Sequence, residues 1–166
     1  MDAEELQERK PVLLFTAGQI DEVLADTQVY PLPFASQYLL GLCAWRNKAL
    51  PVIDPVRFFG LTPPRQETTG RYIVVRTLNP ALDHTPDTLS PDKEQKPSSA
   101  QKLLRCVLKV SDQIISGEVA GQCEAVVPKQ FGLAPDFVRG LFQSKRELFF
   151  LPDLAAIIHS HSTEEK

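Results

Sequence analysis

The chain has 166 residues, of which 43% are hydrophobic and 23% are charged, and its formal net charge is −3. These values are typical of one globular domain of ordinary size with a real core. The acidic balance disfavours a general nucleic-acid-binding role, because phosphate contacts need a basic surface. No apolar stretch approaches the roughly 20 residues that a membrane-spanning helix requires. The polar, acidic start MDAEELQERK is unlike a secretory signal peptide.

The first third of the chain alternates short apolar runs with turn signals. Residues 12–15 are a short apolar run that predicts a strand, and residues 19–25 fit either a helical turn or the lead-in to another strand. Pro31 and Pro33 then predict an extended segment, because proline restricts its own backbone and that of the preceding residue.

The stretch LGLCAWRNKALPVIDP predicts a β-hairpin. Residues 42–45 form one expected strand and residues 49–53 the next, and the polar tripeptide Arg46-Asn47-Lys48 separates them. Asn47 tolerates the positive φ angle that tight hairpin turns require. A turn does not need an arginine, so the turn chemistry leaves Arg46 unexplained.

The central part of the chain holds the clearest strand and the least structured segment. PVRFFG at residues 55–60 predicts a short helix, with proline in its first turn and glycine at its end. RYIVVRT at residues 71–77 predicts a strand whose continuous apolar centre is buried on both faces. Residues 78–102 carry four prolines and few apolar side chains, which predicts a mobile insertion rather than a linker between domains.

From residue 103 the strand pattern resumes. Strands are expected at residues 103–110, 113–119 and 123–127. FGLAPDFVRGLF (131–142) predicts a turn or short helix leading into a strand, and RELFFLPDLAAIIHSH (146–161) predicts a strand followed by a helix. Many short strands, frequent turns and only short helices predict an all-β barrel or sandwich with short helices, and the pattern alone does not choose between the two.

The histidines do not form an expected metal or catalytic site. His84 lies in the Pro-rich insertion, and His159 and His161 lie two residues apart near the C-terminus, where side chains on a helix diverge. We expect these last two to lie on a solvated, fraying end. The sequence has no glycine-rich phosphate loop and no paired-carboxylate signature, so catalysis, cofactor binding and metal binding have no support.

The three cysteines are odd in number and lack metal-type spacing, which predicts reduced, mostly buried thiols in a cytoplasmic protein: Cys43, Cys106 and Cys123. Cys43 would act as a nucleophile only if it were exposed beside a cation such as Arg46. Strand alternation instead puts Cys43 and Trp45 on one face and Arg46 on the other, so Cys43 is expected in the core.

Two phenylalanine pairs allow two interpretations: Phe58, Phe59, Phe149 and Phe150. They would form an exposed docking patch, or half of each pair would be core and half would cover a neighbouring element. The second interpretation is favoured, because scattered surface apolar residues are normal.

Taken in order, these segments resemble the CheW-like family, the coupling proteins of bacterial chemosensory arrays. The resemblance is carried by LLFTAGQIDEVL, YPLPFASQYLLGLCAWRNKALPVIDPVRFFGL, RYIVVRT and DFVRGLFQSKRELFFLPDLAAII. It spans about residues 12–158 in the family's order and spacing, and residues 31–61 are its most specific part. It implies that residues 1–166 form a single CheW-like domain, built as two packed five-stranded SH3-like β-barrels.

The resemblance also implies a function. Such proteins are non-enzymatic, cytoplasmic adaptors that join the CheW-like regulatory domain of a CheA-type histidine kinase to the cytoplasmic tips of methyl-accepting chemoreceptors, at membrane-associated arrays. The arginine of the family's NLRG motif corresponds to Arg46. We therefore predict a partner-binding site at Arg46, Asn47 and Lys48. The alternatives are a salt bridge from Arg46 to an acidic neighbour such as Asp54, which would support the hairpin, and simple solvation of the side chain.

The N-terminus departs from the family pattern and favours an alternative. The family opens with a full apolar strand, whereas only MDAEELQERKP precedes the aligned segment, so this strand is expected to be shortened, polar or absent. An open barrel edge invites pairing. The alternative function is an interaction protein outside the core array, a regulator or localisation factor that self-associates or accepts a partner strand at this N-terminal edge.

Overall fold

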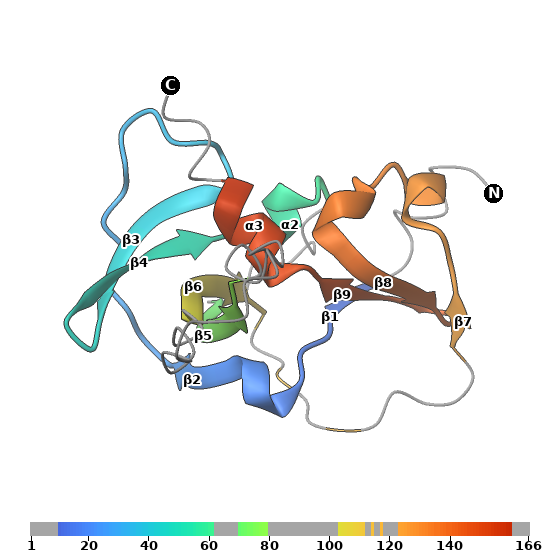
Figure 1. Ribbon diagram of the computed structural model, residues 1–166, viewed down its shortest axis with the longest axis horizontal. Helices are drawn as coiled ribbons and strands as arrows, with labels where there is room; N and C mark the ends of the chain where they lie inside the picture. Colours follow the sequence, from blue (N-terminus) through green and yellow to red (C-terminus); the bar gives the residue numbers. More distant parts are fainter. Residues whose placement is uncertain are drawn as a thin grey trace, which may run out of the picture.

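The computed structural model describes residues 10–61, 70–79, 103–111, 114, 117 and 123–160 (Figure 1). Their strands form two sheets that lie side by side, and two short helices lie near the junction between them (Figure 1). Within these residues no helix is long and apolar enough to cross a membrane. The expectation of an all-β fold with short helices is confirmed.

The larger sheet has five strands in the order β2-β5-β6-β4-β3. Its members are β2 (Ile20–Leu24), β3 (Leu39–Trp45), β4 (Lys48–Ile53), β5 (Arg71–Leu78) and β6 (Leu103–Val110). The predicted hairpin forms as β3 and β4, and the predicted strands at residues 71–77 and 103–110 are β5 and β6. The predicted insertion starts one residue too early, because Leu78 is paired with Leu103 as the last residue of β5.

The smaller sheet has four strands in the order β1-β9-β8-β7, where the resemblance implied a second five-stranded barrel. Its members are β1 (Lys10–Leu13), β7 (Glu124–Ala125), β8 (Val138–Gln143) and β9 (Glu147–Pro152). β1 pairs in parallel with β9, so an N-terminal strand completes the C-terminal sheet. A first strand is thus present, and Val12 and Leu13 in it are half-buried.

The helices are short and begin or end at residues that the sequence marks. They are α2 (Pro55–Phe58) and α3 (Leu154–Ser160), with 3-10 turns η1 (Ala17–Gln19), η3 (Pro128–Phe131) and η4 (Pro135–Phe137). The segment at residues 19–25, expected as a helical turn or as the lead-in to a strand, is mostly strand β2 itself, and η1 precedes it. The predicted turn before a strand is η4 before β8, and the predicted C-terminal helix is α3.

The buried carboxylate of Asp54 fixes the start of helix α2. Asp54 caps the helix, because its carboxylate accepts hydrogen bonds from the backbone nitrogens of Val56 (3.0 Å) and Arg57 (3.2 Å). Arg57 Nε also lies 3.5 Å from the same carboxylate. Gly60 ends the segment with φ of +64°, which glycine adopts without strain. The predicted helix is confirmed, and the Asp54 carboxylate is occupied by capping it and by contacting Arg57.

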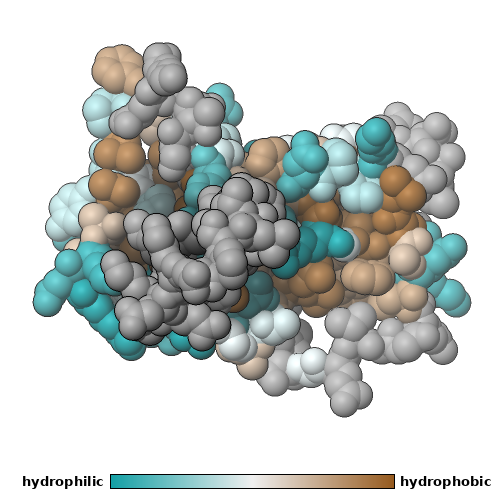
Figure 2. Space-filling view, in the orientation of Figure 1, coloured by the Kyte–Doolittle hydropathy of each residue, from teal (hydrophilic) through white to brown (hydrophobic). Residues whose placement is uncertain are grey.

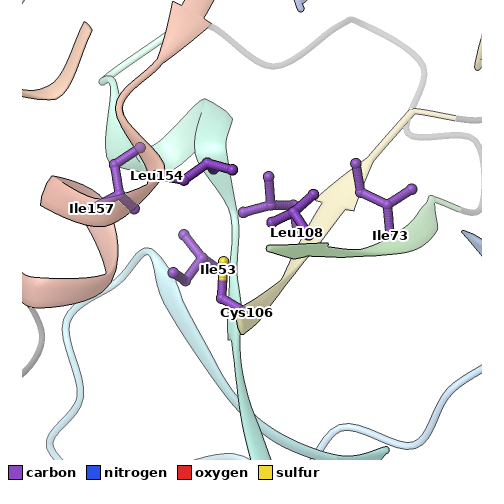
Figure 3. Close-up of a cluster of buried hydrophobic side chains, with 7 residues drawn as sticks. Ile53, Ile73, Cys106, Leu108, Leu154 and Ile157 are labelled. Atoms are coloured by element: carbon purple, nitrogen blue, oxygen red, sulfur yellow. The ribbon is translucent and has the colours of Figure 1, made fainter. Parts of the chain in front are cut away.

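The five-stranded sheet is buried on both faces, as the sequence of β5 predicted. Ile73 and Val75 contact a core shared with α3, whereas Val74 faces the opposite core with Val52. Figure 3 shows side chains of α3, Leu154 among them, directed toward the shared core. Each fully buried aliphatic side chain contributes roughly 1.5–3 kcal/mol, so the burial of Leu154 and Ile157 fixes α3 on the larger sheet.

The smaller sheet has its own core, which is made of Leu133, Val138, Leu141, Leu148 and Phe150. Phe59 packs against both this core and the one under α3, and its ring centroid lies 5.6 Å from that of Phe150. Phe150 is fully buried, whereas Phe58 and Phe59 are half-buried covers. The pair Phe149 and Phe150 therefore agrees with the packing interpretation, whereas the pair Phe58 and Phe59 has no fully buried member.

Some predictions fall outside the described residues. They concern residues 80–102 of the insertion, His84, His161 and most of the strand expected at residues 113–119. The strand expected at residues 123–127 is only two residues long, Glu124–Ala125.

Candidate partner-binding site at the β3–β4 hairpin

The hairpin between β3 and β4 has a two-residue loop. Trp45 pairs with Lys48, which leaves Arg46 and Asn47 as the loop residues, with φ angles of +44° and +61°. Two positive φ angles are the mark of a type I′ turn, the kind that matches the twist of adjacent strands. Asn47 suits this position, as predicted. Arg46 does not, because a long side chain at positive φ carries a local cost.

The side chain of Arg46 folds back over the hairpin. Its guanidinium carbon lies 4.6 Å from the centre of the Trp45 ring, and its Nη2 donates to Glu22 Oε2 at 3.2 Å. The prediction that Arg46 projects away from Trp45 is therefore wrong, because Arg46 belongs to the turn and not to the alternating strand. The side chain is still 68% exposed. It is held in place and open to solvent at once.

Arg46 forms the expected type of contact, a salt bridge, but with a different residue from the one expected. Arg46 forms a salt bridge, but to Glu22 of β2, whereas Asp54 caps α2. An exposed pair of this type contributes about 0–1 kcal/mol. Lys48 is exposed and is the first residue of β4 rather than a loop residue.

Glu22 also binds the ring beneath Arg46. Trp45 Nε1 donates to Glu22 Oε2 at 2.8 Å, while the Trp45 side chain is almost fully buried. A buried indole nitrogen needs an acceptor, and this one lies on β2, at the opposite end of the strand order from β3. The hydrogen bond therefore links the two outer strands and closes the sheet around its core.

A second ion cluster lies next to this contact. Asp21 accepts from Arg105 Nε at 2.7 Å and lies 3.1 Å from Arg76 Nη1. Arg76 and Arg105 face each other directly across β5 and β6, a placement that is unfavourable for like charges. Asp21 compensates for it, and a bulge in β2 between Ile20 and Glu22 lets the consecutive acids serve neighbouring partners.

The surface formed by the hairpin tip and these ion pairs is locally basic. Three guanidinium groups (Arg46, Arg76, Arg105) meet two carboxylates (Asp21, Glu22), which leaves one positive charge, and exposed Lys48 raises this to two. The protein as a whole carries −3. We call these six side chains together with Trp45 the hairpin site.

Burial determines the chemistry of two cysteines. Burial raises the pKa of the Cys43 thiol, and a hydrogen bond from the Thr27 side chain partly opposes the shift. Burial raises the pKa of the Cys106 thiol to about 12. Cys43 is in the core, as predicted, and both thiols are protonated at neutral pH and unsuited to nucleophilic attack. Cys123 is half-buried.

His159 does not lie on the solvated, fraying end that the sequence predicted. It lies in α3, is half-buried, and its Nε2 lies 3.2 Å from Asn79 Oδ1 just after β5. It therefore belongs to the packing between α3 and the larger sheet and not to a solvated end. Among the described residues no group of three or more His, Cys, Asp or Glu side chains could hold a metal ion.

The sequence found part of the hairpin site and missed the rest. It singled out Arg46, Asn47 and Lys48, and the structure places all three at or next to the turn. It missed Glu22 and Trp45, which hold Arg46 in position. The available signals were an acidic pair at residues 21–22 and an aromatic residue immediately before the turn.

Comparisons with known proteins agree with this architecture. A family model described as the CheW-like domain matches residues 5–82. Among solved structures, the chain is similar to the scaffolding protein TtCheW from Thermoanaerobacter tengcongensis, at 18% sequence identity and a TM-score of 0.55. The match covers 82% of this chain and 73% of that chain. No curated protein sequence gives a significant match.

Proposed function

We propose that this chain, whose residues 5–82 match the CheW-like domain model, is a non-enzymatic adaptor of bacterial chemosensory signalling that couples receptor tips to a CheA-type histidine kinase. Its partners would be the CheW-like regulatory domain of the kinase and the cytoplasmic tip of a methyl-accepting chemoreceptor. The protein would work in the cytoplasm, at membrane-associated arrays. An adaptor needs binding surfaces and no reaction chemistry, which fits the protonated, buried thiols.

The observation that carries the proposal is the preset position of Arg46. Its guanidinium is stacked on Trp45 and bonded to Glu22, yet most of the side chain remains exposed. One contact to Glu22 uses part of its fork of five N–H donors. Since the side chain is already ordered, less rotamer entropy is lost when a partner binds the remaining donors.

The charge of the hairpin site indicates the chemistry of the partner surface. A local excess of about two positive charges on an acidic protein favours a partner patch with carboxylates or backbone carbonyl groups. A guanidinium can hold a carboxylate with two parallel hydrogen bonds, which fixes the direction of approach as well as the affinity. We assign Arg46 and Lys48 to the contact and Asn47 to the turn that presents them.

Calorimetric titration of the purified protein with a receptor-tip fragment, and separately with the kinase regulatory domain, tests the proposal. We expect binding to at least one, and Arg46→Ala should weaken it by about tenfold or more, as for a charge-assisted hydrogen bond of 1.5–3 kcal/mol. Lys145→Ala is the matched control, a cation in the β8–β9 turn outside the hairpin site. Binding to neither partner, or equal losses in the two variants, would contradict the proposal.

A second candidate rests on β1. This strand forms an outer edge of the four-stranded sheet, and its described part has only four residues. The outer side of an edge strand presents unpaired backbone groups to which a strand from another protein can pair. The corresponding function is a regulator or localisation factor outside the core array. Protection of β1 amides from hydrogen exchange by a partner that does not involve Arg46 would favour it.

A further inference from the structure

The loop before β3 exposes a run of large apolar side chains. In the sequence YPLPF the apolar residues Tyr30, Leu32 and Phe34 are 54%, 38% and 106% exposed, and they alternate with Pro31 and Pro33. Figure 2 shows apolar surface on this loop, at the upper left of the view. We call residues 30–34 the apolar turn. Apolar residues gathered in this way on a surface mark an interaction site.

The backbone holds Phe34 outward in an unfavourable conformation. Phe34 has φ of +61° and follows Pro33, the arrangement of a type II turn, where glycine or asparagine is the usual residue. A phenylalanine at this angle is strained, and such strain persists mainly at functional positions. Packing within the chain does not explain it, because the Phe34 side chain is fully exposed.

The base of the apolar turn is fixed to the larger sheet. Tyr30 exchanges two backbone hydrogen bonds with Leu42 of β3, at 2.8 and 2.9 Å. Gly41 makes this approach possible, since a Cβ there would collide with the Tyr30 carbonyl oxygen. The turn is therefore a preformed projection, and a partner that binds it orders little additional chain.

A groove with matching chemistry lies on the same chain. It has a volume of about 530 Å³ and runs between α2, the loop at residues 132–134 and the end of α3. Its aromatic members pack edge to face around Phe58, whose ring centroid lies 5.0 Å from those of Tyr38 and Phe137. We call this the aromatic groove. Grooves lined by aromatic rings are suited to receive an apolar side chain such as that of Phe34.

We propose that the apolar turn of one copy docks in the aromatic groove of a second copy, and that the exchange is reciprocal. Phe34 and the groove residue Tyr38 are four residues apart, so at most about 14 Å of chain separates them. With projection and groove this close, a two-fold axis between them lets both copies make the same contact at once. Pro31 and Pro33 lower the entropy cost, since they fix the turn before binding.

The dimer is weak and does not depend on the adaptor function. Two phenylalanines bury about 150–250 Å² each, and with matching groove surface the total is about 800 Å², below the 1,200–2,000 Å² of stable complexes. Association is therefore concentration-dependent. The dimer surface contains neither Arg46 nor Glu22. An experiment that disproves the dimer therefore leaves the proposed adaptor role intact, and one that disproves the adaptor role leaves the dimer intact.

Sedimentation velocity over a wide concentration range tests the projection. The unaltered protein should show a weight-average sedimentation coefficient that rises with concentration, and Phe34→Gly should remain monomeric at the same concentrations. Glycine favours the backbone angle at this position, so the variant folds. Val23→Ala, which trims another exposed apolar residue, should associate like the unaltered protein. A monomer at about 1 mM, or association by Phe34→Gly, would overturn the proposal.

A mixing experiment tests the groove. Ala134→Arg places a charge on an exposed position that lines the groove, and alone it should abolish association. Mixed with Phe34→Gly it should associate measurably, because one variant retains the projection and the other retains the groove. No association in the mixture, or unchanged association of Ala134→Arg alone, would show that Phe34 does not enter this groove.

Discussion

In the part of the chain that the structure describes, two turns hold a non-glycine residue at positive φ, and they differ in what surrounds the side chain. At the hairpin, Arg46 (φ +44°) is stacked on Trp45 and bonded to Glu22. In the loop before β3, Phe34 (φ +61°) is fully exposed. The first strain is offset by contacts inside the chain. The second has no such offset within the described residues, which is the observation behind the proposed contact of Phe34 with another molecule.

The largest effect in this comparison should come from the ring under Arg46. Trp45→Ala removes a nearly buried indole, and we expect the free energy of unfolding to fall by about 3–5 kcal/mol. Urea denaturation gives this value. Trp45→Phe keeps most of the packing and loses only the hydrogen bond to Glu22, so its cost should be about 1–2 kcal/mol. A loss below 1 kcal/mol for Trp45→Ala would mean that the anchor is not structural.

The next effect concerns Asp21, which compensates two facing arginines. Asp21→Ala leaves Arg76 and Arg105 without this carboxylate, and we expect a loss of about 2 kcal/mol in unfolding free energy. Arg76→Ala is the control, and it should cost less because Arg76 is 40% exposed and Arg105 keeps its partner. Equal costs for the two variants would show that the Arg–Arg placement needs no compensation.

The smallest effects compare the two strained turns directly. Phe34→Gly relieves the backbone without removing an internal contact, so it should raise unfolding free energy by about 0.5–1 kcal/mol. Arg46→Gly gains the same relief but loses the Trp45 and Glu22 contacts, so its stability should be nearly unchanged, within about 0.5 kcal/mol. Paired thermal and urea unfolding measures both. Equal gains in unfolding free energy for the two variants would show that the contacts of Arg46 with Trp45 and Glu22 do not contribute to stability.

Local features of the sequence predicted the elements well, and long-range register explains what was missed. The hairpin, the helix after Asp54 and the buried strand at residues 71–77 each depend on residues close together in the chain. The contact of Glu22 with Trp45 joins residues 23 positions apart, and it requires both the bulge in β2 and the closure of the sheet. Short-range patterns carry no record of such pairings.

The same reasoning applies to β1 and to His159. The parallel pairing of β1 with β9 brings together segments from opposite ends of the chain, so the sequence indicated a weak first strand but not its neighbour. His159 lies near the C-terminus, which suggested solvation, whereas the packing of α3 puts it beside Asn79. The strand alternation that misplaced Arg46 failed because Arg46 is a turn residue, to which the alternation of a strand does not apply.

The most direct test of the central claim, that Arg46 is a preset recognition group and not a structural one, is the affinity of Arg46→Lys for the kinase regulatory domain, measured together with its unfolding free energy. Lysine keeps the charge but lacks the planar fork. The account predicts binding weakened by about tenfold or more and stability changed by less than about 0.5 kcal/mol. Unchanged affinity, or a loss of affinity that only parallels a loss of stability, would contradict it.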